Sequence, residues 1–237
     1  MVDFHTHILP GVDDGSGSIA ESMQMLRVSR AQGVSHVVAT PHFYPDRINL
    51  QAFLRRREQA EAVLRTAMAA EPGLPELIVG AEVHFFRGMS QSDALQALTV
   101  GTYPLLLVEM PLCRWTDAMY RELEDISRNQ GITPVIAHIE RYLGGFSGRS
   151  LLRKVQALPV LVQASGDFFL SRGTESLAMG MLKAGGIHLL GSDCHNMKTR
   201  KPNLGAAAER IAARLGNDGL ERIRRSEGEI LGVWRPV

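Results

Sequence analysis

The feature that most constrains this chain is a regular alternation between short apolar runs and longer stretches of helical pattern. In most of the short runs the apolar residues are consecutive, a pattern typical of parallel strands that are covered on both faces. The sequence therefore predicts an α/β fold with a parallel sheet. We expect its strands at Val2–His7, Val34–Thr40, Leu77–Val83, Pro104–Glu109, Thr133–His138, Val160–Ala164 and Ile187–Ser192.

The stretches between these runs carry helix signals at their ends. Ser18 and Glu21 form the pattern of a capping box, and Gly33 stands where the helix that they begin would end. Repeated strand-and-helix units favour a closed or nearly closed parallel barrel. A doubly wound open sheet is the alternative, but the chain has no glycine-rich phosphate loop after its first strand. We expect further helices at Asn49–Ala70, Thr116–Gln130, Thr174–Ala184 and Asn203–Leu215.

Length and charge narrow the functional classes. The chain has 237 residues without a linker or an obvious repeat, so we expect a single domain over residues 1–237. Its 26 basic and 25 acidic residues give a net charge of +1, which predicts no nucleic acid partner. No apolar run is long enough for membrane insertion, and two cysteines, Cys113 and Cys194, cannot build a disulfide framework. We therefore expect a cytoplasmic protein.

Residue types that bind metals stand at or just after the ends of the predicted strands. The carboxyl ends of all strands in a parallel barrel lie on one face, so side chains that are far apart in the sequence are predicted to converge there. The residues concerned are His5, His7, Asp14, His42, Glu82, Glu109, His138, Asp193 and His195.

A single histidine at a strand end is usually structural, but the whole set points to metal ions. Gathering many carboxylates and imidazoles without a cation leaves charges that repel one another or lose their hydration, which costs free energy. Bound metal ions remove that cost. Imidazole and carboxylate ligands without thiolate suit Zn, Mn or Fe, and the set is too large for one ion. It therefore predicts a cluster of two or three metals.

Several residues of the set lie in motifs that resemble a known family. The opening Asp3–His7 (DFHTH) and Asp13–Gly15 (DDG) resemble the polymerase-and-histidinol-phosphatase (PHP) superfamily. Gly80–Glu82 (GAE), Ile136–Tyr142 (IAHIERY) and Ser192–Asn196 (SDCHN) are similar to its manganese-dependent bacterial protein-tyrosine phosphatases, which accompany capsular and exopolysaccharide synthesis. The resemblance implies the PHP fold, a distorted (β/α)7 TIM-like barrel, with a trinuclear cluster of Mn²⁺, or of Fe or Zn.

The resemblance also implies how the ligands are shared. The first ion would be held by His5, His7, Glu82 and Asp193, the second by Glu82 as a bridge with Glu109 and His138, and the third by Asp14, His42 and His195. Arg141 matches the arginine with which the family contacts phosphate, and we expect Arg200 to supply a second guanidinium.

These assignments predict a protein-tyrosine phosphatase in which metal-activated hydroxide attacks phosphorus. The resemblance implies, as substrate, the phosphotyrosine-bearing tail of a bacterial tyrosine kinase that sets polysaccharide chain length. It also implies a homo-oligomer contact through the helix near Glu21 and Ser22. Two alternatives stay open. One is a PHP phosphoesterase that acts on a small molecule such as histidinol phosphate or a nucleotide, and the other is a non-catalytic binding module with a degraded site.

Cys194 and Arg200 have the spacing found in cysteine-based tyrosine phosphatases. We interpret this match as chance, because the five residues between them contain no glycine for a phosphate-binding loop. Aromatic residues after the strand ends form a separate hypothesis, a wall around a phosphotyrosine ring made by Phe43, Tyr44, Phe85, Phe86 and Trp115. His84 is left out of the predicted site.

Overall fold

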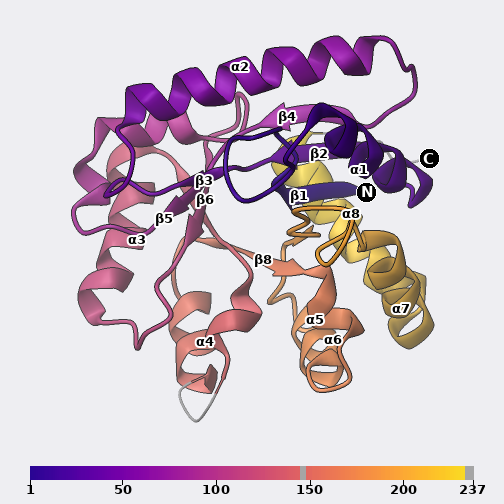
Figure 1. Ribbon diagram of the computed structural model, residues 1–237. Coiled ribbons are helices and arrows are strands. Elements are labelled where there is room, and N and C mark those ends of the chain that lie inside the picture. Colours follow the sequence, from indigo (N-terminus) through magenta and orange to yellow (C-terminus); the bar gives the residue numbers. More distant parts are fainter. Residues whose placement is uncertain (145–147, 233–237) are drawn as a thin grey trace.

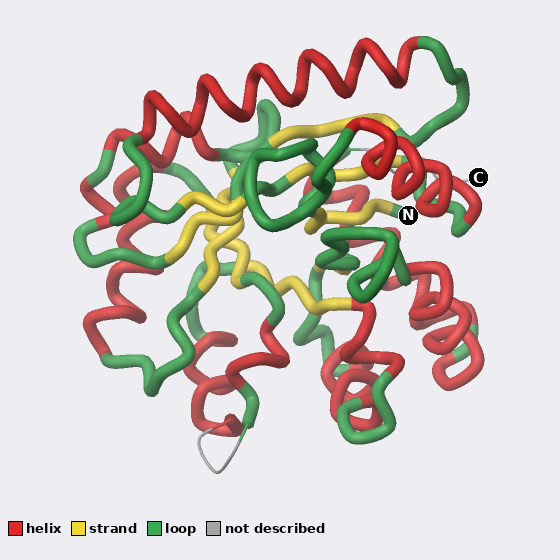
Figure 2. Tube along the Cα trace, in the orientation of Figure 1, coloured by secondary structure: helices red, strands yellow, loops and turns green. Residues whose placement is uncertain are grey.

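A parallel sheet forms the centre of the molecule. The computed structural model describes residues 1–144 and 148–232. In Figure 2 the strands curve around a common centre and the helices lie outside them. The strands are β1 (Val2–Thr6), β2 (His36–Ala39), β3 (His42–Phe43), β4 (Glu76–Val79), β5 (Glu82–His84), β6 (Leu105–Glu109), β7 (Thr133–Ile136), β8 (Leu161–Ser165) and β9 (Leu189–Gly191).

The sheet is hydrogen-bonded in two pieces. One has the order β1-β2-β4 and the other the order β3-β5-β6-β7-β8-β9, and all neighbouring pairs are parallel. The predicted strand Val34–Thr40 is shorter in the structure, where β2 spans His36–Ala39, and the two-residue strand β3 follows after Pro41. The predicted strand Leu77–Val83 is interrupted between β4 and β5. Backbone bonds between Asp193 N and His5 O (2.8 Å) and between His7 N and Cys194 O (2.9 Å) bring the two outer edges together.

The α/β class with a curled parallel sheet is therefore confirmed. The seven strand-and-helix units implied by the resemblance are not established by this hydrogen bonding. The region of two predicted strands is divided between the two parts of the sheet, as β2 and β3 and as β4 and β5.

Helices cover the outside of the sheet, with α2 along one side and α3 to α7 around the other (Figure 1). Their bounds are α1 (Ile19–Ala31), α2 (Leu50–Ala69), α3 (Asp117–Gln130), α4 (Gly148–Gln156), α5 (Gly166–Leu170), α6 (Glu175–Lys183), α7 (Leu204–Leu215) and α8 (Asn217–Leu231), with short 3₁₀ helices at Met89–Gln91, Asp93–Leu98 and Ile139–Tyr142.

The predicted helix ends have a physical basis in the structure. The Ser18 side chain accepts a hydrogen bond from the backbone N–H of Glu21 (3.2 Å), which caps α1 as the sequence predicts. The Asn49 side chain accepts from Ala52 N (2.9 Å) and caps α2 in the same way. These caps fix where the chain leaves the loops at the carboxyl ends of the strands, and so they help to position those loops.

Within α1, Glu21 and Ser22 hold loops rather than project from the protein. Glu21 accepts from Met197 N (3.1 Å), and the buried Ser22 hydroxyl donates to the carbonyl of Ile8 (2.6 Å). The homo-oligomer contact expected here stays a prediction.

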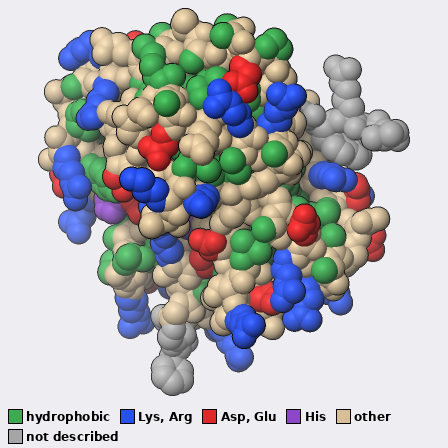
Figure 3. Space-filling model, turned by 45° about the vertical axis from the view of Figure 1, so that its right-hand side comes forward, with side chains coloured by type: hydrophobic (Ala, Val, Ile, Leu, Met, Phe, Trp, Pro, Cys, Tyr) green, Lys and Arg blue, Asp and Glu red, His purple; other side chains and the backbone are tan. Residues whose placement is uncertain are grey.

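The surface has no strong single-sign field on the face that Figure 3 shows, where basic and acidic side chains are interspersed. This distribution accords with the net charge of +1. Among residues 1–144 and 148–232, no helix combines the length and apolarity that crossing a bilayer requires.

A substitution at Gly191 measures how tightly β9 packs against β1, the strand that carries His5. A Cβ added at Gly191 would lie 2.5 Å from His5 Cβ and 3.0 Å from His5 N. Gly191→Ala is expected to lower the free energy of unfolding by about 1–3 kcal/mol, because the two strands must move apart. Gly180→Ala in α6 meets nothing within 4 Å and is expected to raise it by up to about 1 kcal/mol. Urea unfolding of both variants measures this, and equal stability of the two would contradict the packing.

Candidate metal centre

Strand register brings the predicted ligands together. Across the β3–β5 pair, His42 lies beside Glu82, and across the β5–β6 pair, His84 lies beside Glu109. His5 and His7 are two residues apart at the end of β1, so both side chains point to the same side. Their Nε2 atoms lie 3.1 Å from each other. Residues that are distant in the sequence thus meet at one rim of the sheet.

Glu82 lies at the middle of the cluster and is almost completely buried. Its Oε2 is 2.9 Å from His42 Nδ1, 3.2 Å from His5 Nε2 and 3.3 Å from His7 Nε2. Its Oε1 is 2.8 Å from His138 Nε2. Burial by itself raises the pKa of Glu82, but the charge of His5, the hydrogen bond of His138 and the close contact of His42 outweigh it and hold the pKa well below its usual range.

Asp193 links this cluster to the two predicted arginines. Its Oδ1 lies 3.5 Å from His5 Nε2 and 3.4 Å from His7 Nε2. Its Oδ2 accepts hydrogen bonds from Arg141 Nη2 (2.7 Å) and Arg200 Nη2 (2.6 Å). Burial opposes ionisation of this carboxyl, but the neighbouring histidines lower its pKa below the usual range. Both guanidinium groups are about a third exposed, at 37% and 38% of the side chain, so they face solvent at the edge of the cluster.

The remaining predicted ligands lie at the two ends of the cluster. Oδ1 of the exposed Asp14 lies 3.6 Å from His42 Nε2 and 3.5 Å from His195 Nε2. Burial, with the nearby charges of His7 and Arg200, lowers the pKa of His195 to about 4, which favours the neutral ring. Near the other end of the cluster, Oε1 of Glu109 is 3.7 Å from Nε2 of His138.

Side chains that the sequence did not predict hold the ligands in place. Nδ1 of His7 lies 2.7 Å from Asp13 Oδ2, and the same carboxylate accepts from the backbone N–H of His42 (2.9 Å). With its Nδ1 proton directed to Asp13, His7 presents the lone pair of Nε2 to the cluster. The acidic pair in the loop after β1 signals Asp13, although only its neighbour Asp14 entered the predicted set.

Gln163 and Tyr142 play comparable parts on the other side. Gln163 Oε1 lies 3.3 Å from His5 Nδ1 and accepts from the backbone N–H of His138 (2.6 Å). The Tyr142 hydroxyl is 3.4 Å from His138 Nδ1. Tyr142 stands one helical turn after His138, a spacing that could have revealed it, whereas nothing around Gln163 in the sequence does so.

His138 and Asp193 have strained backbones. They are the non-glycine residues with positive φ in the described part of the chain, at 31° and 52°. This region is unfavourable for residues with a Cβ, and such strain concentrates at functional sites. The fold therefore accepts a local cost to aim these two side chains at the cluster.

The donor set and its unpaired atoms fit metal ions. Within residues 1–144 and 148–232, the buried atoms Glu82 Oε2, His42 Nδ1 and His195 Nε2 lack a hydrogen-bond partner. Buried polar atoms normally have a partner, and bound metal ions would supply one to these three. In the described chain, three overlapping sets have donor atoms within 4.8 Å of one another, namely His5, His7 and Asp193; His42, Glu82 and Glu109; and His7, Asp14, His42 and His195.

Two other sequence interpretations can be compared with these positions. Phe43 is not part of a pocket wall, because His42 points to the cluster and the alternation of β3 turns Phe43 the other way, onto Phe53 with ring centroids 5.0 Å apart. His84, which was left out of the site, lies 3.2 Å from Glu109 Oε2 through its Nδ1. Tyr44 and Trp115 do line cavities beside the cluster.

Comparison with known proteins follows this geometry. A family model described as capsular polysaccharide synthesis, CpsB/CapC, matches residues 1–231. The chain belongs to this family. It is 30% identical to tyrosine-protein phosphatase CpsB of Streptococcus pneumoniae in an alignment of 239 positions, gaps included, that covers 91% of each chain. It is 28% identical to tyrosine-protein phosphatase YwqE of Bacillus subtilis over 207 residues, which cover 84% of this chain and 79% of that protein.

Solved structures extend the comparison to the fold. The structure is similar to one from a study of YwqE and of CpsB from Streptococcus pneumoniae, described as metal-dependent tyrosine phosphatases, with a TM-score of 0.84 and 25% identity. That match covers 100% of this chain and 96% of the other. N-isopropylammelide isopropylaminohydrolase from Burkholderia multivorans matches with a TM-score of 0.54 and 16% identity, over 98% of this chain and 74% of that one, which shows a shared fold alone.

The two cysteines are expected to differ sharply in reactivity. Cys113 is exposed, whereas Cys194 is buried, and its burial raises its pKa well above the usual value. In the native protein, a thiol reagent such as DTNB should modify Cys113 quickly and Cys194 only after denaturation, because the thiolate is the reactive form. Cys113→Ser should remove the fast phase and Cys194→Ser should leave it intact. Fast modification of Cys194 in the native protein would contradict its assignment as a structural residue.

Proposed function

We propose that this protein is a metal-dependent protein-tyrosine phosphatase. The observation that supports this most directly is the pair of guanidinium groups on Asp193, a carboxylate that is also in contact with the imidazole cluster. Cations at that edge can bind a phosphoryl group next to the place where metal ions would be held. The family to which the chain belongs, and the tyrosine-protein phosphatases similar to it, support the same activity.

We propose that the nine predicted residues are the metal ligands and that Mn²⁺ is the resident metal, with Fe or Zn as alternatives. Divalent ions bound there supply Lewis acidity, which activates water and offsets charge on phosphoryl oxygens. A trinuclear cluster accounts for the donor sets, since His7 and His42 each belong to two of them. The ligands are grouped in this proposal as the family resemblance implies, with Glu82 as a bridge and with His138 and Glu109 on one ion. His138 Nε2 lies 2.8 Å from Glu82 Oε1 and 3.7 Å from Glu109 Oε1.

The chain's own residues prepare the site for a phosphate monoester. Arg141 Nη1 also reaches Glu109 Oε1 (3.4 Å), so its guanidinium spans two carboxylates and stays at the rim. The donors of Arg141 and Arg200 that these carboxylates leave free can bind the phosphoryl oxygens. Asp13, Gln163 and Tyr142 fix the orientation of the histidine rings, so the site needs little reorganisation as negative charge develops.

The wider setting is also part of the proposal. We place the activity in the cytoplasm, in a single domain over residues 1–237 with a distorted (β/α)7 barrel of the PHP type. The substrate proposed is the phosphotyrosine tail of a bacterial tyrosine kinase in capsular or exopolysaccharide synthesis, which accords with the description of the family. A phosphotyrosine tail requires an open approach, and a cavity of about 840 Å³ lies beside Arg141.

Activity assays on the purified protein test this function. We expect hydrolysis of a phosphotyrosine peptide, loss of that activity in EDTA, and recovery with added Mn²⁺, Fe²⁺ or Zn²⁺. His138→Ala should lower kcat/KM by about 100-fold or more, because it removes a proposed ligand, while the buried Cys194 can become Ser with little effect.

Histidinol phosphate, assayed in parallel, separates this proposal from the small-molecule alternative. Preference for histidinol phosphate over the peptide would contradict a protein substrate. Activity that survives complete chelation would contradict the dependence on metal.

A further inference from the structure

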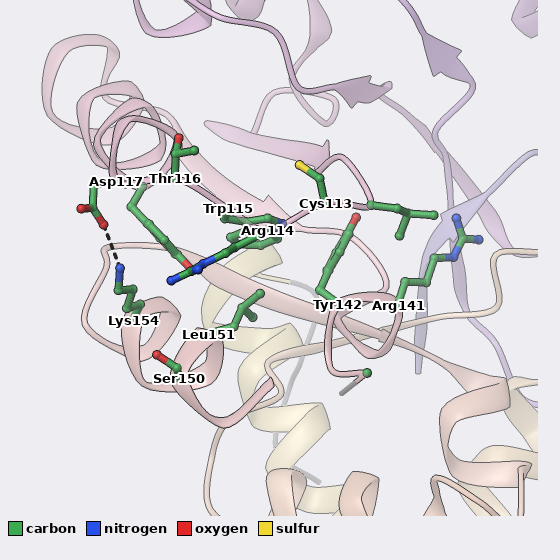
Figure 4. Close-up of a pocket in the computed structure, with 13 residues that line it drawn as sticks. Cys113, Arg114, Trp115, Thr116, Asp117, Arg141, Tyr142, Ser150, Leu151 and Lys154 are labelled. Carbon is green, nitrogen blue, oxygen red and sulfur yellow. Dashed lines mark hydrogen bonds and ion pairs between the residues drawn. The ribbon is translucent and has the colours of Figure 1, made fainter. Parts of the chain in front are cut away.

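A cavity lies beside Arg141, next to the proposed active site. Figure 4 places Lys154 and Asp117 at one end and Arg141 at the other, with Arg114, Trp115 and Tyr142 between them. Its volume is about 840 Å³, which exceeds what a single tyrosine side chain fills. Residues of the loop after β6, the start of α3, the 3₁₀ helix at Ile139–Tyr142 and α4 line it.

The lining is basic at its solvent edge. Arg114 is exposed and forms no ion pair with any residue that the structure describes. Lys154 contacts Asp117 at 2.8 Å, but this pair is exposed, with the Asp117 side chain 76% accessible, so solvent screens it. Arg141 pairs with Asp193 and Glu109, so the positive charge that the groove offers comes from Arg114 and from Lys154, whose pair with Asp117 solvent screens. This charge favours an acidic ligand.

The floor of the groove is packed from aromatic side chains and contacts the metal centre through Tyr142 and Arg141. Trp115 and Tyr142 are buried and pack edge to face with ring centroids 5.1 Å apart. The Tyr142 hydroxyl lies 3.4 Å from His138 Nδ1, and Arg141 belongs both to the groove and to the hydrogen bonds on Asp193. A chain bound in the groove thus lies beside Arg141, the residue that the proposed function assigns to the phosphoryl group. At the rim, the 77% exposed Leu112 offers apolar contact.

We infer that this groove binds the acidic residues that flank the phosphotyrosine of a protein substrate. The inference rests on the proposed function, since it names which phosphotyrosine sequences the same site prefers. Arg114 and Lys154 determine specificity and lie outside the metal centre, so they act on peptide binding and not on hydrolysis. An extended peptide advances about 3.3 Å per residue, and a groove of this size holds a few residues beside the phosphotyrosine.

The kinetic test compares two charge-reversed variants of the metal-loaded enzyme. One is Arg114→Glu with Lys154→Glu. Its control is Arg222→Glu with Arg225→Glu on α8, which changes the net charge equally at exposed positions. The substrates are p-nitrophenyl phosphate and two phosphotyrosine peptides, one with Asp and Glu flanks and one with Lys flanks.

For the groove variant we expect a rise in KM for the acidic peptide of about tenfold, with kcat unchanged, as two exposed ion pairs predict. Hydrolysis of p-nitrophenyl phosphate should stay within about twofold of wild type, and the control variant should keep the preference for the acidic peptide. Equal preference in the groove and control variants would overturn the inference. If the metal-loaded wild-type protein hydrolyses none of these substrates, p-nitrophenyl phosphate included, the proposed function itself would be contradicted.

A binding measurement on the unmodified protein does not depend on how the variants fold. Cys113 lines the groove and is exposed. An acidic peptide that carries phosphonomethyl-phenylalanine, which cannot be hydrolysed, should slow thiol labelling of Cys113 at least about fivefold. The Lys-flanked peptide at the same concentration should not. Equal protection by both peptides, or protection by neither, would overturn the inference.

Discussion

The structure depends on one constraint, a buried carboxylate surrounded by imidazoles. Glu82 has ring nitrogens of His5, His7, His42 and His138 between 2.8 and 3.3 Å from its oxygens. Such a group is stable in a protein interior only if positive charge compensates it and each ring is held in the right orientation. The partners of the outer ring nitrogens, the strained φ of His138 and Asp193, and the close contact of β1 with β9 all serve that arrangement.

Much of this centre could be predicted from the sequence because the parallel topology determines where the strand ends lie. Strand ends meet on one side of the sheet whatever their separation along the chain, so His5 and Asp193 converge although they are 188 positions apart in the sequence. Local patterns could not supply the rest. The short helix α5 lacks the length for a clear helical period, and Gln163 reads as an ordinary strand residue. The orientation of the Phe43 side chain could not be predicted, because it depends on the register of β3 with β5.

The same cluster explains why a cysteine mechanism does not suit this site despite its spacing. Cys194 follows Asp193 within the packed edge between β1 and β9, and burial raises the pKa of its thiol. Arg200 instead donates a hydrogen bond to the carboxylate of Asp193, so the loop that carries Cys194 and Arg200 positions this carboxylate. Arg141 then connects the centre to the basic groove, which separates two tasks: the buried side chains prepare the chemistry, and the exposed side chains select what approaches it.

Anomalous X-ray diffraction from crystals of the protein, purified without chelators, tests the central claim most directly. Data on both sides of the Mn, Fe and Zn absorption edges identify each metal and place it. The account predicts anomalous peaks between Glu82 and the surrounding histidines, within bonding distance of Glu82 Oε2 and Asp193 Oδ1. A crystal with no peak there after Mn²⁺ is added, and with the imidazoles at hydrogen-bonding distance from Glu82, would contradict it.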